Sequence, residues 1–463
     1  MEWWSIGVLE CCGQAVHHSS NPLHPDSAAI LLLKMIPPIL QHSTTPSLRW
    51  LVALGLGLLL LTNAAADEPF RPVAGKFPPL EKAHAYRGEL VFVDHVNRRG
   101  SIRVQSTGIF RFTAPSPFTM LPYGIIMYHG KPAELRDIPL GTILYIRAFL
   151  PPDPKTSAVP VLPINNRTKT NNGGPGTAPA ENHVILLEDE SSHCMREGLV
   201  WKLKELEIKN HEGTITTSRE SKQDGDSKAN EETLTFDAAT RVWRGREYLR
   251  IEHLIAEGAW PAEGKKTLSG QSVQLDITWK PTPGGVFARF HISDIWLDDA
   301  AMQNAAHRQT ETHKAFMRSR WLPAWIDAVD YGKFGRATVT ATLFGGMAPS
   351  LYADFKKGGT ALMNPVEYTL KHTEGGTAGP TQMAARGKLI DVTQLPGAVP
   401  FGSSGIQIHF ETDLITEGLR PTRVVRVRPA EWPDVHVPRE EHLSDGASSI
   451  DERFPTPAIF PKY

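Results

Sequence analysis

The stretch REGLVWKLKELEIKNHEGTITT (residues 196–217) contains an arginine, an acid nine residues later, a glycine eight residues after that, and then an alternating Thr/Ile run. The stretch RSRWLPAWIDAVDYGKFGRATV (residues 318–339) has the same three landmarks at the same spacing, 122 residues further along the chain. A looser third copy contains Arg87, Asp94 and Gly100. Self-similarity on this scale predicts three units of one supersecondary plan.

Apolar and polar residues alternate around these landmarks, as at Ile102 and Val104, which is typical of half-buried strands. Gly141 and Gly270 precede later strands of this kind. Short strands, glycine turns and one helical turn per unit, expected near residues 81–87 and 190–197, predict a mainly β protein. We expect tandem small β-barrels of about five strands each, with one longer helix and extended termini.

The units resemble OB-like barrels, which bind oligonucleotides and oligosaccharides, in strand count and size. The order of export signal, small barrel, linker and small barrel also resembles that of uncharacterised exported bacterial proteins. The resemblance covers roughly residues 80–428 and carries no catalytic signature. It therefore implies a fold and a compartment, and no particular chemistry.

Changes in composition along the chain predict its domain boundaries. Residues 152–182 are rich in Pro, Gly, Asn and Thr, which is typical of a linker. A long helix is expected to begin near Asp298 and to end before Pro323. The expected parts are a leader (1–66), a tether (67–80), three barrels (81–151, 183–296 and 321–428), the linker (152–182), the helix (297–320) and an extended tail (429–463).

The leader resembles a secretory signal peptide. Arg49 precedes an apolar run from Trp50 to Leu61, and small residues at Ala64 and Ala66 are placed for cleavage before Asp67. The run is short of the ~20 residues that a bilayer span requires. We expect export to the periplasm, the cell envelope or the medium; an uncleaved leader acting as a membrane anchor is the alternative.

Charge and cysteine content restrict the partners and the compartment. The 463 residues carry a formal net charge of −1, with 49 basic and 50 acidic residues, so no global field attracts nucleic acid or anionic lipid. Met35 would start a leader of ordinary length, in which case Cys11 and Cys12 are not translated. Cys194 then remains as the single cysteine of the mature chain, and no intramolecular disulfide can form.

Two sets of residues have spacings that could bind a metal. The string Glu-x-x-His-x-x-Arg occurs from Glu81 and again from Glu190, and a brace of the barrel by Glu–Arg pairs explains it better than a metal does. On the predicted long helix, His307 and Glu311 lie four residues apart and His313 is nearby. These three are the metal candidates, and solvated side chains are the competing explanation.

A basic strip near the end of the third unit is the candidate binding surface. Its residues are Arg420, Arg423, Arg426 and Arg428, with Trp321 and Trp325 expected nearby. Arginine beside aromatic side chains can bind anionic glycans, phospholipid headgroups or bases. The competing explanation is that the arginines protect an edge strand with their charge and that the tryptophans belong to the core.

These patterns favour an exported, non-enzymatic scaffold or binding module, with no cofactor, whose partner is an envelope protein or a glycan. The first alternative is a metal-dependent hydrolase with its site between units two and three. The second is binding of an anionic glycan or single-stranded nucleic acid through OB-like surfaces, where neutral charge and export disfavour nucleic acid. A cavity with convergent polar groups would favour the enzyme.

Overall fold

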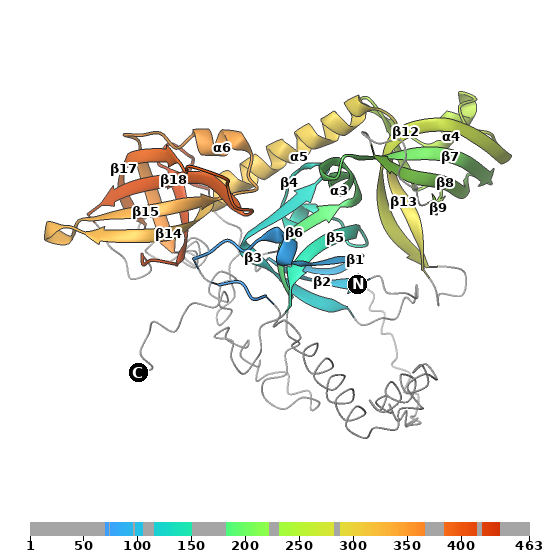
Figure 1. Ribbon diagram of the computed structural model, residues 1–463. Coiled ribbons are helices and arrows are strands. Elements are labelled where there is room, and N and C mark those ends of the chain that lie inside the picture. Colours follow the sequence, from blue (N-terminus) through green and yellow to red (C-terminus); the bar gives the residue numbers. More distant parts are fainter. Residues whose placement is uncertain are drawn as a thin grey trace, which may run out of the picture. The chain divides into compact units, whose positions relative to one another are not determined.

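The protein is mainly β and contains three small closed barrels in tandem, as the sequence predicts (Figure 1). A computed structural model describes residues 70–73, 75–95, 98–104, 115–150, 182–221, 231–281, 288–365, 384–413 and 419–435. The leader 1–66, most of the 152–182 linker and the tail beyond 435 lie outside these ranges. No helix within the described ranges has both the length and the apolar character needed to cross a bilayer.

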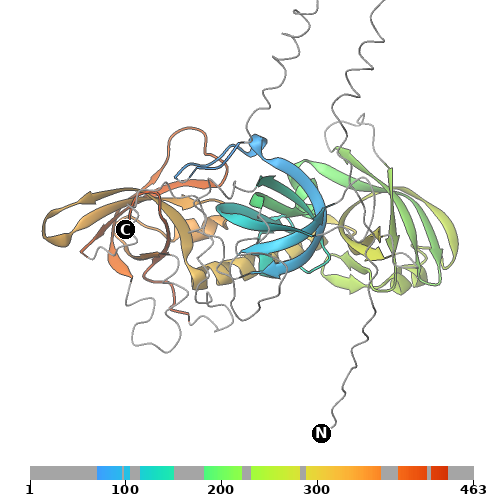
Figure 2. The same cartoon turned by 90° about the horizontal axis from the view of Figure 1, so that it is seen from below.

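Barrel 1 contains five strands that close into a ring, in the order β2-β1-β5-β6-β3 with β3 paired back to β2. The pairing of β3 with β6 is parallel and the others are antiparallel. Figure 2 shows these strands, coloured blue to teal, curving around the barrel. Its elements are η2 (Leu80–Lys82), β1 (His84–Asp94), β2 (Arg99–Val104), β3 (Ser116–Tyr128), the short β4 (Lys131–Pro132), η3 (Leu135–Asp137), β5 (Ile143–Phe149) and β6 (Asn182–Asp189).

Barrel 2 repeats this topology. Its ring is β8-β7-β12-β13-β9. Within this ring one pairing is parallel, that of β9 with β13, and as in barrel 1 it joins the third and fifth ring strands in chain order. Apolar residues inside it include Trp201, Leu206 and Ile215, none of which is exposed. Its elements are β7 (Leu199–Lys209), β8 (Glu212–Ser221), β9 (Glu231–Phe236), β10 (Arg241–Arg244), β11 (Glu247–Leu249), α4 (Ile251–Ala256), β12 (Gly264–Pro281) and β13 (Ala288–Trp296).

Barrel 3 has a different topology. Six strands close in the order β14-β15-β18-β17-β16-β19, and every pairing is antiparallel. Its elements are β14 (Leu322–Tyr331), η4 (Lys333–Gly335), β15 (Ala337–Phe344), α6 (Pro349–Ala353), β16 (Thr360–Pro365), β17 (Ala385–Gln394), β18 (Ser403–Thr412) and β19 (Val424–Pro429). Barrels 1 and 2 are therefore the closer pair.

The predicted long helix is α5 (Asp299–Arg320). Asp298 caps it by accepting a hydrogen bond from Ala301 N at 2.7 Å, which satisfies one of the free N–H groups of its first turn. Gln309, on its buried side, donates to Asp137 Oδ2 at 3.1 Å and to the carbonyl of Pro132 at 3.2 Å. The helix therefore packs on barrel 1 as well as leading into barrel 3.

Three details of the sequence interpretation were wrong. The segment 152–182 does not separate two barrels, because β6 pairs with both β3 and β5 and so completes barrel 1; the boundary falls at α3 (Glu190–Arg196). Of the helical turn expected near 81–87, only the 3-10 turn η2 (Leu80–Lys82) is present, and residues 84–87 belong to β1; the expected turn at 190–197 is α3. The matched stretches 196–217 and 318–339 both contain a helix end, a strand, a turn and a second strand in that order. Their glycines, Gly213 and Gly335, are however not structurally equivalent.

Gly213 lies inside β8, where an added Cβ would come within 1.9 Å of the Glu207 carbonyl oxygen. Gly335 lies in the turn before β15 with a φ of +76°. The structural counterpart of Gly213 is Gly100 of β2, where a Cβ would come within 2.7 Å of the Phe92 carbonyl oxygen. The two glycines allow close backbone approach in a hairpin, and Gly335 permits a left-handed turn.

Candidate functional site

The start of α3 places two buried acids where barrels 1 and 2 meet. Asp189 caps the helix: its Oδ1 accepts a hydrogen bond from Ser192 N at 2.9 Å, and its Oδ2 accepts one from Ser191 Oγ at 2.8 Å. Glu190 follows on the first turn, with no exposed side-chain surface. Capping and burial fix both carboxylates in position.

The turn after β3 brings His129 to the same place. His129 has a φ of +53°, and its backbone N–H donates to Asp189 Oδ2 at 3.0 Å. The next residue, Gly130, donates its N–H to Ser192 Oγ at 2.8 Å. The imidazole stacks on Tyr128, with ring centroids 3.8 Å apart. A left-handed conformation for a histidine is uncommon, and these contacts hold the ring in one orientation.

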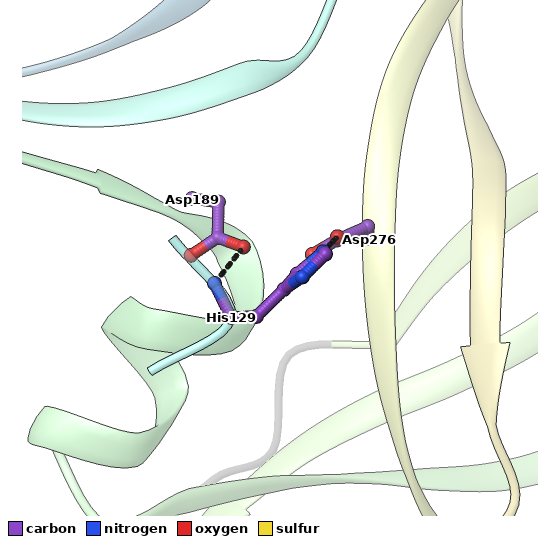
Figure 3. A group of neighbouring side chains, drawn as sticks. All are labelled: His129, Asp189 and Asp276. Carbon is purple, nitrogen blue, oxygen red and sulfur yellow. Dashed lines mark hydrogen bonds and ion pairs between the residues drawn. The ribbon is translucent and has the colours of Figure 1, made fainter. Parts of the chain in front are cut away.

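The ring of His129 reaches Asp276 on β12 of barrel 2. His129 Nε2 lies 3.1 Å from Asp276 Oδ2, and Figure 3 shows the two side chains pointing toward one another. Asp276 is 3% exposed. Its other oxygen, Oδ1, is buried and has no hydrogen-bond partner among the described residues. One ligand-type atom from each of His129, Asp189 and Asp276 lies within 4.8 Å of the others.

Negative charge exceeds positive charge around this cluster. Asp276 stands directly opposite Asp294 in the β12–β13 pairing, and like charges in such a pair repel. Asp294 is satisfied by Arg241 at 2.6 Å and by Trp243 Nε1 at 2.9 Å. Three buried carboxylates therefore share one guanidinium and the imidazole of His129.

The pKa values follow from this arrangement. Burial and the charge of Asp189 raise the pKa of Asp276 to about 7. Burial opposes protonation of His129, but its hydrogen bond to Asp276 and the surrounding carboxylates outweigh that effect and raise its pKa.

Glu190 is the centre of a second buried cluster at the junction. Its carboxylate accepts hydrogen bonds from Arg219 at 2.8 Å, Arg87 at 3.1 Å and Tyr145 at 3.0 Å. Attraction to Arg219 and Arg87 outweighs the cost of burial and lowers its pKa. Arg87 comes from barrel 1 and Arg219 from barrel 2, so Glu190 joins the two barrels.

The structure separates the metal candidates of α5. His307 and Glu311 are exposed, and Glu311 pairs with Lys314 at 3.0 Å. His313 is 1% exposed, and the charges that act on it belong to Glu134, Asp137 and Arg98 of barrel 1. The three do not assemble a metal site, so the hydrolase proposed between units two and three loses its ligands.

The described contacts of the two Glu-x-x-His-x-x-Arg strings are ion pairs and ring stacking that brace the barrels. Arg87, the end of the first string, pairs with Glu190, the start of the second. His193 stacks on Tyr145 with ring centroids 3.7 Å apart, and Arg196 pairs with Glu188 at 2.8 Å. Cys194 is buried and donates its thiol to Glu190 at 3.4 Å.

The aromatic residues of the basic strip are in the interior. Trp321 and Trp325 are 4% and 2% exposed, and Trp325 packs against Phe344. Arg428 is itself buried, with its guanidinium 4.9 Å from the centre of the Trp321 ring. Arg426 donates to the Trp321 carbonyl at 3.3 Å, while Arg420 and Arg423 are partly exposed. The expected stacking surface for sugars or bases is therefore absent from these residues.

Sequence reasoning missed His129 and Asp276. The first lies 60 residues from Asp189 and the second 147 residues from His129, so no local spacing connects them. The available signal was the Tyr-His-Gly turn at 128–130, in which a histidine precedes a glycine at the end of a long apolar strand.

No family model, curated protein or solved structure matches the chain. The resemblance to exported bacterial proteins therefore remains an expectation.

Proposed function

We propose that this is an exported, non-enzymatic protein of the cell envelope that binds a partner through one end of barrel 2. The observation that supports this is a groove of about 410 Å³ at that end. The volume lies within the usual range for small-ligand sites. Small β-barrels of the kind it resembles bind oligosaccharides and oligonucleotides on their surfaces.

The charges of the groove favour a neutral, polar ligand. Three cationic and three anionic side chains line it: Lys209, Lys280, Arg289, Glu207, Glu212 and Asp237. Such a balance does not attract the polyanionic backbone of a nucleic acid. It does supply donors and acceptors for the hydroxyl groups of a sugar, so an envelope glycan is the partner that we favour over an envelope protein.

The buried junction supports a scaffold more than an enzyme. The carboxylate of Glu190 is occupied by two arginines and a tyrosine, and that of Asp189 by a helix cap and the His129 turn. Groups held in this way stabilise the contact between barrels. The groove of barrel 2 is then presented on a fixed support.

Binding of peptidoglycan and capsular oligosaccharides to the mature chain, residues 67–463, tests the proposal. Calorimetry should detect a neutral or zwitterionic oligosaccharide, with binding weakened at least tenfold in Lys209→Ala and Arg289→Ala. Lys356→Ala, which removes an exposed cation of barrel 3, is the matched control and should bind normally. Tighter binding of single-stranded nucleic acid, or turnover of the glycan, would contradict the proposal.

Export is a separate part of the proposal. It rests on the apolar run 50–61 and the small residues before Asp67. Full-length protein expressed in a bacterial host should be recovered outside the cytoplasm, with an N-terminus near Asp67. Soluble cytoplasmic protein that still carries residues 1–66 would refute export without refuting glycan binding.

A further inference from the structure

The strongest unassigned feature is the cluster of His129, Asp189 and Asp276. It lies apart from the groove of barrel 2, whose lining residues include none of the three. Each residue comes from a different element: the turn after β3, the start of α3 and the strand β12. A ligand that bound all three would therefore join barrel 1 to barrel 2.

Buried charge is the first argument that a cation binds here. Asp189, Asp276 and Asp294 are 0%, 3% and 3% exposed, and Arg241 is committed to Asp294. Burying a carboxylate without a cation or hydrogen bonds costs several kcal/mol. Asp276 makes one hydrogen bond among the described residues, to His129, and its Oδ1 makes none.

The geometry is the second argument. His129 Nε2 and Asp276 Oδ2 lie 3.1 Å apart. Two ligands bound to one tetrahedral zinc ion by bonds of about 2.1 Å would lie about 3.4 Å apart. The ligand-type atoms of all three residues lie within 4.8 Å of one another. Small movements of the side chains would therefore bring three ligands onto one ion.

The surroundings of the ligands provide the third argument. Asp189 is oriented by His129 N, Ser191 Oγ and Ser192 N, and Oδ1 accepts only the last of these. Outer hydrogen bonds of this kind fix ligand orientation in metal sites. The side chain of His129 is 19% exposed, so water can reach the cluster and complete the coordination.

We propose that His129, Asp189 and Asp276 bind one divalent transition-metal ion of the zinc type. One imidazole and two carboxylates are nitrogen and oxygen ligands suited to such an ion. The ion adds positive charge to a cluster in which carboxylates outnumber cations, and it links β12 of barrel 2 to the turn after β3 and to α3. The site is structural, since it joins two barrels and needs no substrate.

Titration of chelator-treated mature protein with Zn²⁺ tests this inference. Calorimetry should give close to one equivalent bound, and the melting temperature should rise with free Zn²⁺ because the ion binds the folded state. His129→Gln and Asp276→Asn each remove one ligand and should weaken binding at least tenfold. His307→Ala removes an exposed histidine of α5 and should leave the affinity unchanged.

X-ray absorption of the zinc-loaded wild type needs no variant, so it holds even if a substitution prevents folding. It should show one imidazole nitrogen, the remaining ligands being oxygen. The absence of Zn²⁺ binding at millimolar concentration, a spectrum with two or more imidazoles, or full affinity in both folded variants would overturn the proposal. Binding of Ca²⁺ in preference to Zn²⁺ would overturn the transition-metal assignment.

Discussion

Replacing Glu190 by Gln should lower the free energy of unfolding by about 3 kcal/mol or more. The side chain is fully buried, and it faces Arg87 and Arg219, whose side chains are 17% and 21% exposed. Gln keeps the size and one acceptor oxygen, so the change removes charge and little volume. The two neighbouring, partly buried guanidinium groups would then share Glu232 alone, which pairs with Arg219 at 2.6 Å and with Arg87 at 3.9 Å. Removing one partner of a buried ion pair typically costs 3–5 kcal/mol, and the partial exposure of the arginines places this case at the lower end.

Urea unfolding of the mature protein, followed by far-UV circular dichroism and tryptophan fluorescence, measures this effect. Glu311→Gln is the control, because Glu311 is an exposed acid paired with Lys314 on α5. The control should shift stability by no more than about 0.5 kcal/mol, as surface substitutions usually do. If Glu190→Gln were as stable as the control, the ion cluster would not hold barrels 1 and 2 together.

Two further predictions concern barrel 2. Burial lowers the pKa of His291 to about 4, so the unfolded chain binds a proton below about pH 6.5 that the folded chain excludes. The free energy of unfolding that depends on neutral His291 should therefore fall, by up to about 3 kcal/mol, as pH decreases from 6.5 to 4. Denaturation experiments across this range should show that the difference in unfolding free energy between the wild type and His291→Gln narrows. A difference that stays constant with pH would contradict this prediction. Gly213→Ala should destabilise by at least about 2 kcal/mol in the same assay, because its Cβ would overlap the Glu207 carbonyl oxygen, whereas Thr214→Ala should cost less.

The fold was largely readable from the sequence because its signals are local. Two-residue alternation marks strands, and Asp298 with Pro323 brackets α5. The order of strands within a barrel has no local sequence signal. The sequence therefore places β6 in the wrong barrel and does not predict the six-stranded topology of barrel 3. The equal spacing of arginine, acid and glycine in two stretches also predicts equivalent glycines, which is wrong, because Gly213 and Gly335 have different backbone roles.

The candidate site was less predictable than the fold. Glu190 was singled out within a repeated string, but its arginine partners come from β1 and β8, which only folding brings together. His129 and Asp276 belong to no motif, and their proximity results from the docking of two barrels. Conversely, His307 and Glu311 match a helical spacing and yet lie on the exposed side of α5, away from buried His313.

Photo-crosslinking in intact cells tests whether barrel 2 binds a glycan in the envelope. A photoreactive amino acid at position 209 lies in the groove, and one at position 356 on barrel 3 serves as the control. We predict that the probe at 209 crosslinks the processed protein to envelope glycan and that the probe at 356 does not. Crosslinking from 209 to cytoplasmic nucleic acid or protein, or equal glycan yields from both positions, would contradict the claim.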